Sequence, residues 1–292
     1  MPQWQGKSKG NKLGYKIFIF VCRKFGLFPA YFILLFVALY YFLFSWESSR
    51  HIYSHFRNRF KFSMPKSILA IYRNYYIFGQ ILIDKFVVMG GIKNRVTFTF
   101  DGEQNLHNIV SMERGGILLS GHVGNWEIAG DLLKRLNTKI NIVVFDAEHK
   151  WIKEYSNQVL FANYNLIVMK EDMSHVYEIG DALNRNELIC LHADRFVDEA
   201  KTLEMDFFNQ KALFPVGPFA LAATFKVPVS FVFSFKETLR HYHFYGSPII
   251  DFDPTLSKSE YIKYMATQFV QLFQKMVEKY PLQWFNYYKF EK

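Results

Sequence analysis

The sequence predicts an α/β fold in which helices flank a mixed sheet, preceded by an N-terminal helix that associates with a membrane. Two observations predict this fold class. Beyond residue 96, short β-branched and apolar segments alternate with longer amphipathic ones, which is typical of strands and helices packed in layers. Near the N-terminus, residues 27–46 form an uncharged apolar segment about as long as a membrane is thick.

The N-terminal segment combines a basic stretch with this apolar one. Residues 1–24 contain six Lys and Arg side chains and no acid. Phe44-Ser45-Trp46 does not resemble the small residues of a signal-peptide cleavage site, so we expect the segment to be retained. Basic residues also follow it, so charge does not select an orientation. A true span, a helix lying in the membrane interface and a buried core helix all remain open.

We expect one domain behind this segment. Residues 1–50 are the basic N-terminus and membrane-associated helix, and residues 51–292 form the domain, with a helical entry at 51–95 and an α/β core at 96–292. In the entry, apolar residues recur every three or four positions, and the helical pattern is interrupted at Met64-Pro65.

The core is predicted element by element from its periodicity. Strands are expected at 96–100, 116–120, 140–145, 166–169, 187–192, 203–208, 227–235 and 240–245, the last two as a hairpin. Helices are expected at 125–136, 151–164, 174–184, 217–225 and 261–280.

Composition narrows the choice of partners. The net charge of +9 fits anionic lipid or an acidic carrier protein, and 19% aromatic residues fit membrane contact. The chain has no zinc-finger spacing and no aromatic RNA-binding motif, so we expect no nucleic-acid partner. Its two cysteines are too few for a disulfide framework and indicate a reducing compartment.

The most informative motif lies where a predicted strand meets a predicted helix. His122 follows the strand and Glu127 falls in the first turn of a helix that Asn125 is placed to cap. The glycines at 121 and 124 favour a tight turn that folds the imidazole toward the carboxylate. Such a pair forms a general base for a hydroxyl or amine that attacks an acyl group. The alternative is a buried histidine at a strand end followed by an unrelated glutamate.

Other candidates for chemistry are weaker. The chain has no Gly-x-Ser-x-Gly elbow, and neither cysteine lies near His122 in sequence, so no protein nucleophile is indicated. His241 and His243 share a strand face at a spacing compatible with metal. Because no third ligand of motif quality accompanies them, we expect exposed strand histidines, no metal and no cofactor.

The motif and the segments after it resemble a known family. ILLSGHVGNWEIAG, at 117–130, resembles the histidine–acid box of bacterial lipid A late acyltransferases, part of the wider lysophospholipid/glycerophosphate acyltransferase superfamily. HADR at 192–195, FFNQKA at 207–212 and FPVGP at 214–218 resemble that family's later blocks, as does PLQWFNYY at 281–288. The resemblance extends over roughly residues 90–292.

The resemblance implies an acyltransferase-like fold and a reaction. His122 would be the general base and Glu127 its orienting partner. The donor would be a fatty acyl thioester on acyl carrier protein or coenzyme A, and the acceptor a hydroxyl or amine of a lipid or glycolipid such as a lipid A precursor. The site would lie at the bacterial inner membrane, on the cytoplasmic face, where acyl carriers occur. The implied substrate-binding residues are Asn125, Asp194, Arg195, Pro215 and Gly217.

The sequence is compatible with more than one role for several of these residues. Backbone N–H groups at the start of the Asn125 helix, or Arg195, would stabilise an oxyanion. Arg195 is equally placed to bind a phosphate or to pair with Asp198 or Glu199. Asp194 would orient Arg195 or cap a turn, and Gly217 would approach a phosphate at a helix start.

This chain departs from the family pattern in three places. Asn209 stands where a glycine is expected, Arg195 where many relatives carry an amide, and the N-terminus is unusually basic. These departures resemble an uncharacterised branch linked to aryl-polyene-type lipids and leave the acceptor open. The alternatives are a thioesterase or lipid hydrolase, and a non-catalytic lipid-binding protein on the same fold.

Overall fold

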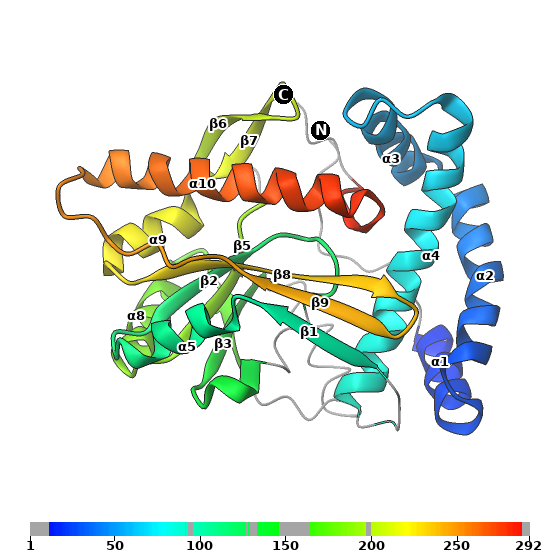
Figure 1. Ribbon diagram of the computed structural model, residues 1–292, viewed down its shortest axis with the longest axis horizontal. Helices are drawn as coiled ribbons and strands as arrows, with labels where there is room; N and C mark the ends of the chain where they lie inside the picture. The colour runs from blue at the N-terminus through cyan, green and yellow to red at the C-terminus, as the bar shows by residue number, and fades with distance from the viewer. Residues whose placement is uncertain are drawn as a thin grey trace.

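The centre of the protein is a seven-stranded mixed sheet (Figure 1). The computed structural model describes residues 12–90, 92, 96–126, 128, 133–145, 164–196 and 200–287. In sheet order the strands are β1 (Thr97–Asp101), β9 (His241–Gly246), β8 (Val229–Thr238), β2 (Gly116–Ser120), β5 (Leu188–His192), β3 (Ile140–Phe145) and β4 (Tyr164–Met169).

The strand directions divide the sheet into two parts. β8, β2, β5, β3 and β4 are parallel, whereas β9 runs antiparallel to β8 and parallel to β1. Parallel strands are normally covered on both faces. All five residues of β2, at the centre, are accordingly buried.

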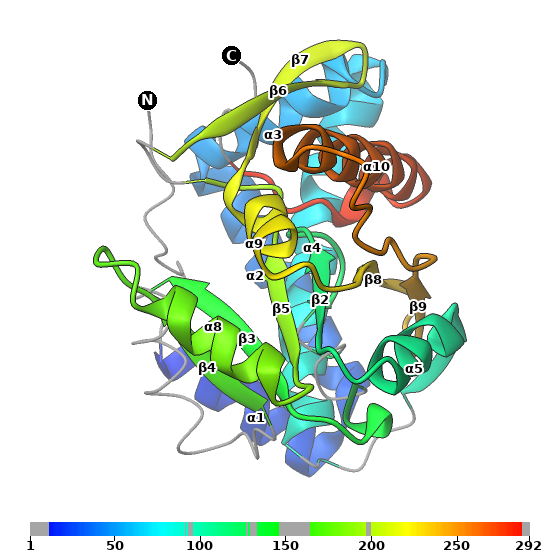
Figure 2. The same cartoon turned by 90° about the vertical axis from the view of Figure 1, so that its left-hand side faces the viewer.

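Helices cover both faces of the sheet (Figures 1 and 2). Alternate residues such as Leu119 and Phe233 pack in one apolar cluster with α8 (His175–Asn184), α9 (Gly217–Phe225) and α10 (Lys258–Lys279). On the opposite face, Leu118 and its neighbours pack with α5 (Glu103–Ser111) and the 3₁₀ turn at Leu133–Leu136. This arrangement confirms the predicted fold class of a mixed sheet flanked by helices.

Four N-terminal helices stand against one end of the sheet (Figure 1). They are α1 (Lys12–Phe25), α2 (Leu27–Phe44), α3 (Trp46–Asn58) and α4 (Met64–Met89). α4 lies between the sheet and α2. Gly79 of α4 permits the close approach of α2, because a Cβ at this position would lie 2.4 Å from a methyl carbon of Leu34.

The apolar helix α2 has two different faces. Ala30, Leu34 and Ala38 are buried, whereas Phe32 and Phe36 on the other side are more than 60% exposed. By length and composition α2 is the helix, among the described residues, that is able to cross a membrane, and 28% of it is buried within the protein.

Most of the predicted elements are present, with small shifts at their ends. The predicted interruption is present, but it lies between the end of α3 at Asn58 and the start of α4, where Met64-Pro65 forms the first turn. The 227–235 and 240–245 segments form the antiparallel pair β8–β9. α10 begins earlier than predicted because Ser257 and Glu260 form a capping box. Tyr164, predicted as the end of a helix, is the first residue of β4, and the rest of that predicted helix lies outside the described residues.

Three elements were not predicted. α1 and α5 are helices, and β7 (Gln210–Pro215) pairs with β6 (Thr202–Phe207) as a separate two-stranded hairpin. The two residues between these strands, Phe208 and Asn209, have φ values of 53° and 58°. Asn is the residue that best tolerates this left-handed conformation after Gly. The turn therefore explains why Asn209 is acceptable where the family resemblance suggested a glycine.

Candidate active site

The candidate site forms where two neighbouring parallel strands end. β2 and β5 are paired so that Ser120 lies opposite His192. The segments that follow them leave the sheet at the same edge, as expected for parallel strands with the same direction. His122 and Asp194, two residues beyond each of these positions, are thereby brought together although they are 72 residues apart in the chain.

Asp194 holds His122 with both carboxylate oxygens. Its Oδ1 lies 2.7 Å from His122 Nδ1, and its Oδ2 accepts a hydrogen bond of 3.0 Å from the His122 backbone N–H. The two contacts fix both the loop and the ring. The Asp194 side chain is 1% exposed, whereas the His122 side chain is 14% exposed. The histidine is therefore the member of the pair that is accessible from outside the protein.

The charge state of Asp194 determines which nitrogen of His122 is basic. Burial raises the pKa of the Asp194 carboxyl, but the attraction and hydrogen bond of His122, together with the charge of Arg195, outweigh it and hold that pKa well below its ordinary value. An ionised carboxylate only accepts hydrogen bonds, so Nδ1 of His122 carries the hydrogen. The lone pair of the neutral ring is therefore on Nε2, which is the arrangement of a general base.

The loop that carries His122 is held by backbone contacts with β8 and the C-terminal segment. Gly124 N–H donates to the Gln283 carbonyl (2.8 Å), and Asn125 N–H donates to the Ser234 carbonyl (2.8 Å). The His122 carbonyl accepts from Phe285 N–H (3.1 Å). The N–H groups of Gly124 and Asn125 are therefore engaged within the protein. The oxyanion role of the N–H groups at the start of the helix that follows Asn125 stays a prediction.

Gly124 is required by the shape of this loop, and we expect Gly124→Ala to lower the free energy of unfolding by about 2 kcal/mol or more. Its φ is +54°, and an added Cβ would lie 1.8 Å from the Ser234 carbonyl oxygen. Gly217→Ala is the matched control, because a Cβ there meets nothing within 4 Å. Urea unfolding of both variants measures the difference, and equal stabilities would contradict this role for Gly124.

Asn125 is a structural part of the site. It is 1% exposed, and its side-chain oxygen accepts from the Ile128 backbone N–H at 3.3 Å, as predicted for a helix cap. Its Nδ2 donates to the Ile81 carbonyl of α4 (3.3 Å) and to the Tyr242 hydroxyl of β9 (3.4 Å). The amide is thus engaged at both ends inside the protein, and it connects the His122 loop to two other elements.

Arg195 brings a positive charge to the site. Its Nη2 donates to the Phe285 carbonyl (2.6 Å), and its charge acts on Asp194 and His192. The suggested partners Asp198 and Glu199 lie outside the described residues, as does Glu127.

The other two predicted substrate-binding residues lie farther along the chain. Pro215 ends β7, and Gly217 begins α9. α9 connects back to β8, which is parallel to β2. The start of α9 therefore lies toward the edge of the sheet that carries His122. The contacts that hold the His122–Asp194 pair come from other residues.

His192 is a member of the site that the sequence did not single out. Its ring lies against that of His122, with centroids 4.2 Å apart and the planes tilted by 31°, and Trp126 meets it edge-on at 4.7 Å. Its Nδ1 is buried and has no hydrogen-bond partner among the residues that the structure describes. HADR at 192–195 suggested Asp194 and Arg195 as candidates; only the pairing of β2 with β5 shows that His192 faces His122.

His122, His192 and Asp194 together carry the types of side chain that bind metal ions. One ligand atom each of His122, His192 and Asp194 lie within 4.8 Å of one another. Nδ1 of His122 already contacts Asp194 Oδ1 at 2.7 Å, which is the contact of a histidine base with its orienting carboxylate.

Burial of His192 predicts a specific acid sensitivity. Desolvation, reinforced by His122, lowers the pKa of His192 well below its ordinary value. Below about pH 6.5 the unfolded chain takes up a proton that the folded chain does not, so stability falls by up to about 1.4 kcal/mol per pH unit from this group. We expect His192→Gln to reduce this loss between pH 6.5 and 5.5, measured by urea unfolding at each pH. An unchanged pH dependence would contradict the assignment.

A cysteine nucleophile is not indicated at this site. Cys190 lies on β5, and burial raises the pKa of its thiol to about 12, which keeps it protonated and unreactive. The arrangement is therefore suited to activating an external hydroxyl or amine.

Comparison with known proteins now identifies the family. The family model for bacterial lipid A biosynthesis acyltransferases matches residues 66–289. Among solved structures, the chain is similar to the 1-acyl-sn-glycerophosphate (LPA) acyltransferase PlsC from Thermotoga maritima, at 14% identity and a TM-score of 0.41, covering 87% of this chain and 99% of that one. No curated protein sequence matched. The family match covers α4 of the helical entry almost completely, both halves of the His122–Asp194 pair and most of the C-terminal segment, and the chain belongs to the bacterial lipid A biosynthesis acyltransferase family.

Proposed function

We propose that this acyltransferase moves a fatty acyl group from an acyl thioester, on acyl carrier protein or coenzyme A, to a hydroxyl or amine of a membrane lipid or glycolipid such as a lipid A precursor. The observation that carries the proposal is the 2.7 Å contact between His122 Nδ1 and the buried Asp194 carboxylate. It leaves Nε2 as an oriented base at the end of a buried strand.

The chemistry follows from this base. Nε2 of His122 takes the proton of the acceptor hydroxyl or amine as its oxygen or nitrogen bonds to the thioester carbonyl carbon. Asp194 stabilises the imidazolium that results. When the tetrahedral intermediate collapses, the carbon–sulfur bond breaks and the imidazolium returns the proton to the leaving thiolate. Glu127 is the alternative proposal for the carboxylate that orients the ring, in place of Asp194.

Arg195 is the proposed source of positive charge for the reaction. Its guanidinium has five N–H donors in a planar fork, suited to an oxyanion or to a phosphate on the substrate. The contact to the Phe285 carbonyl fixes the position of this group beside Asp194. We assign it to substrate binding, together with Gly217 at the start of α9.

The proposed location is the cytoplasmic face of the bacterial inner membrane. The exposed apolar side of α2, with the basic residues Arg23 and Lys24 just before it, supports contact with an anionic membrane. The face is chosen because acyl carriers are cytoplasmic. Protease treatment of spheroplasts tests it: digestion of the domain from outside intact spheroplasts would contradict this orientation.

Comparative lipid mass spectrometry tests the proposed reaction. Host cells with the wild-type gene should contain a lipid with one more acyl chain than cells without the gene, and cells expressing His122→Ala should not. A purified assay adds a second test, in which thioester consumption should require the acceptor. Equal consumption without acceptor would indicate hydrolysis instead of transfer.

A further inference from the structure

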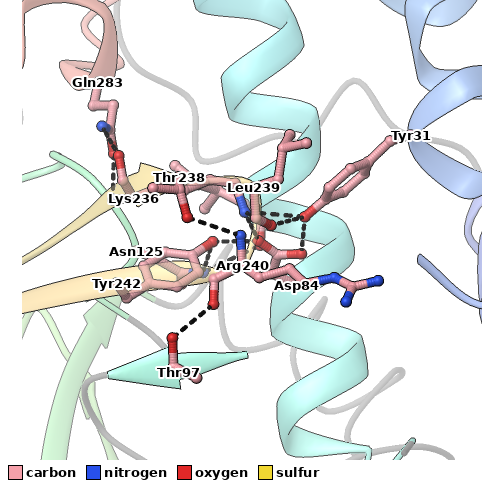
Figure 3. Close-up of polar contacts among 11 residues, drawn as sticks. Tyr31, Asp84, Thr97, Asn125, Lys236, Thr238, Leu239, Arg240, Tyr242 and Gln283 are labelled. Atoms are coloured by element: carbon pink, nitrogen blue, oxygen red, sulfur yellow. Dashed lines mark hydrogen bonds and ion pairs between the residues drawn. The ribbon is translucent and has the colours of Figure 1, made fainter. Parts of the chain in front are cut away.

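Next to the site, four side chains from four different elements form a buried polar cluster (Figure 3). They are Asp84 of α4, Lys236 of β8, Tyr31 of α2 and Tyr242 of β9. Asp84 and Tyr242 are fully buried, Tyr31 is 3% exposed and Lys236 is 8% exposed. None of the four belongs to the chemistry described above.

Every charge in this cluster is matched. Asp84 Oδ2 lies 2.5 Å from the Lys236 ammonium and accepts from the Tyr242 hydroxyl at 2.5 Å. Its Oδ1 accepts from the Tyr31 hydroxyl. The ammonium also donates to the Leu239 carbonyl (2.9 Å) and to the Tyr31 oxygen (3.0 Å).

Stability alone does not account for such a cluster. The free-energy cost of removing two charges from water offsets most of the attraction between them. Replacing a buried ion pair with well-packed apolar residues is therefore often neutral or stabilising. What a fully satisfied network does provide is a fixed relative position of the elements that it joins.

Two routes connect this cluster to the loop that carries His122. In the first, the Tyr242 hydroxyl that donates to Asp84 also accepts from Asn125 Nδ2 (3.4 Å), three positions after His122. The same Asn125 nitrogen donates to the Ile81 carbonyl, on the turn of α4 before Asp84.

The second route passes through Lys236 itself. Its backbone N–H donates to Gln283 Oε1 (2.9 Å), and its carbonyl accepts from Gln283 Nε2 (2.7 Å). The Gln283 carbonyl in turn accepts from Gly124 N–H (2.8 Å), two positions after His122.

We propose that Asp84, Lys236 and Tyr242 are positioning residues, which hold the His122 loop at its working geometry by joining Asn125 and Gly124 to α4, β8 and β9. Tyr31 extends the network to α2. The packing position of this apolar helix and the position of the base therefore depend on the same four side chains. The inference rests on the proposed function, in which His122 is the base.

The test replaces the charges while preserving the packing. The double variant Asp84→Leu with Lys236→Met removes both charges together and leaves apolar side chains of similar size. We expect its melting temperature to stay within a few degrees of the wild type and its KM for the thioester within twofold, while kcat falls about tenfold or more. A structural role alone would leave kcat unchanged once the protein is folded.

Tyr242→Phe provides an independent measurement, because it removes only the hydroxyl that links Asp84 to Asn125. We expect a fall in kcat of about threefold or more with an unchanged KM. Tyr245→Phe is the matched control on the same strand, since its hydroxyl bonds Tyr280 and Lys279, outside the cluster. Its kcat should equal that of the wild type.

Two outcomes would overturn the proposal. One is a folded double variant with a kcat within twofold of the wild type, and the other is a Tyr242→Phe variant indistinguishable from Tyr245→Phe. If the double variant does not fold, the kcat of Tyr242→Phe, compared with that of Tyr245→Phe, tests the proposal by itself. The wild type is assayed first, so a failure of acyl transfer itself would be visible there, whereas a failure of the positioning role would appear only in the variants.

Discussion

Replacing His122 with Ala is expected to lower acyl transfer by the purified protein by at least about a hundredfold, the usual scale for a lost general base. Without the imidazole, nothing takes the proton from the acceptor as its bond to the acyl carbon forms. The effect should fall on kcat more than on KM, because the proton moves only in the transition state. Initial rates with a defined thioester and the identified acceptor measure both quantities.

His241→Ala is the matched control for this experiment. His241 lies on β9, and its ring bonds the Thr97 and Thr99 side chains on the neighbouring strand (2.8 and 3.1 Å). The His241→Ala variant should transfer acyl groups at the wild-type rate. Transfer by His122→Ala within threefold of that control would exclude His122 as the base and favour the lipid-binding reading of this fold.

The fold was largely predictable because periodicity within a short window determines which residues are buried. β2 and β3 were placed at their observed bounds, since a run of apolar and β-branched residues has few other stable arrangements. α5 was missed for the opposite reason. Only Leu106 and Ile109 of its nine residues are buried, and two apolar residues do not form a recognisable period.

The candidate site was only half predictable from the sequence. His122 was identified from local features, namely a strand end and flanking glycines, and Asn125 was correctly predicted to cap the following helix. The pairing with Asp194 depends on β2 and β5 being neighbours, which is a property of strand order. Proximity in the sequence therefore suggested Glu127 as the partner of His122. In the structure, the pairing of the two strands brings Asp194 to His122 from 72 residues away.

The contact of the His192 ring with His122 and the buried Asp84–Lys236 pair could not be predicted from the sequence either. Asp84 lies in a helix otherwise rich in apolar residues, where a lone acid gives no indication of its partner. Lys236 lies 152 residues away, near the end of a strand. Such pairs become visible only when the packing of helices against the sheet is known.

Asp194→Asn is expected to lower kcat by about a hundredfold or more, while KM changes little. The carboxylate keeps the hydrogen on Nδ1 and stabilises the imidazolium. An amide loses the charge, and it can also donate to Nδ1, which would move the hydrogen to Nε2 and block the base. Because Asn keeps the shape of Asp and can still accept from the His122 backbone N–H, the loop should remain in place.

Comparing Asp194→Asn with Glu127→Gln assigns the orienting carboxylate. The direct 2.7 Å contact with His122 Nδ1 predicts that the Asp194 variant loses more activity than the Glu127 variant. Asp206→Asn, on an exposed strand and paired with Lys211, is the matched control and should retain full activity. A larger loss in Glu127→Gln would return the orienting role to Glu127. In that case Asp194 would serve chiefly to hold the backbone of the His122 loop, and its substitution should then lower the melting temperature more than kcat.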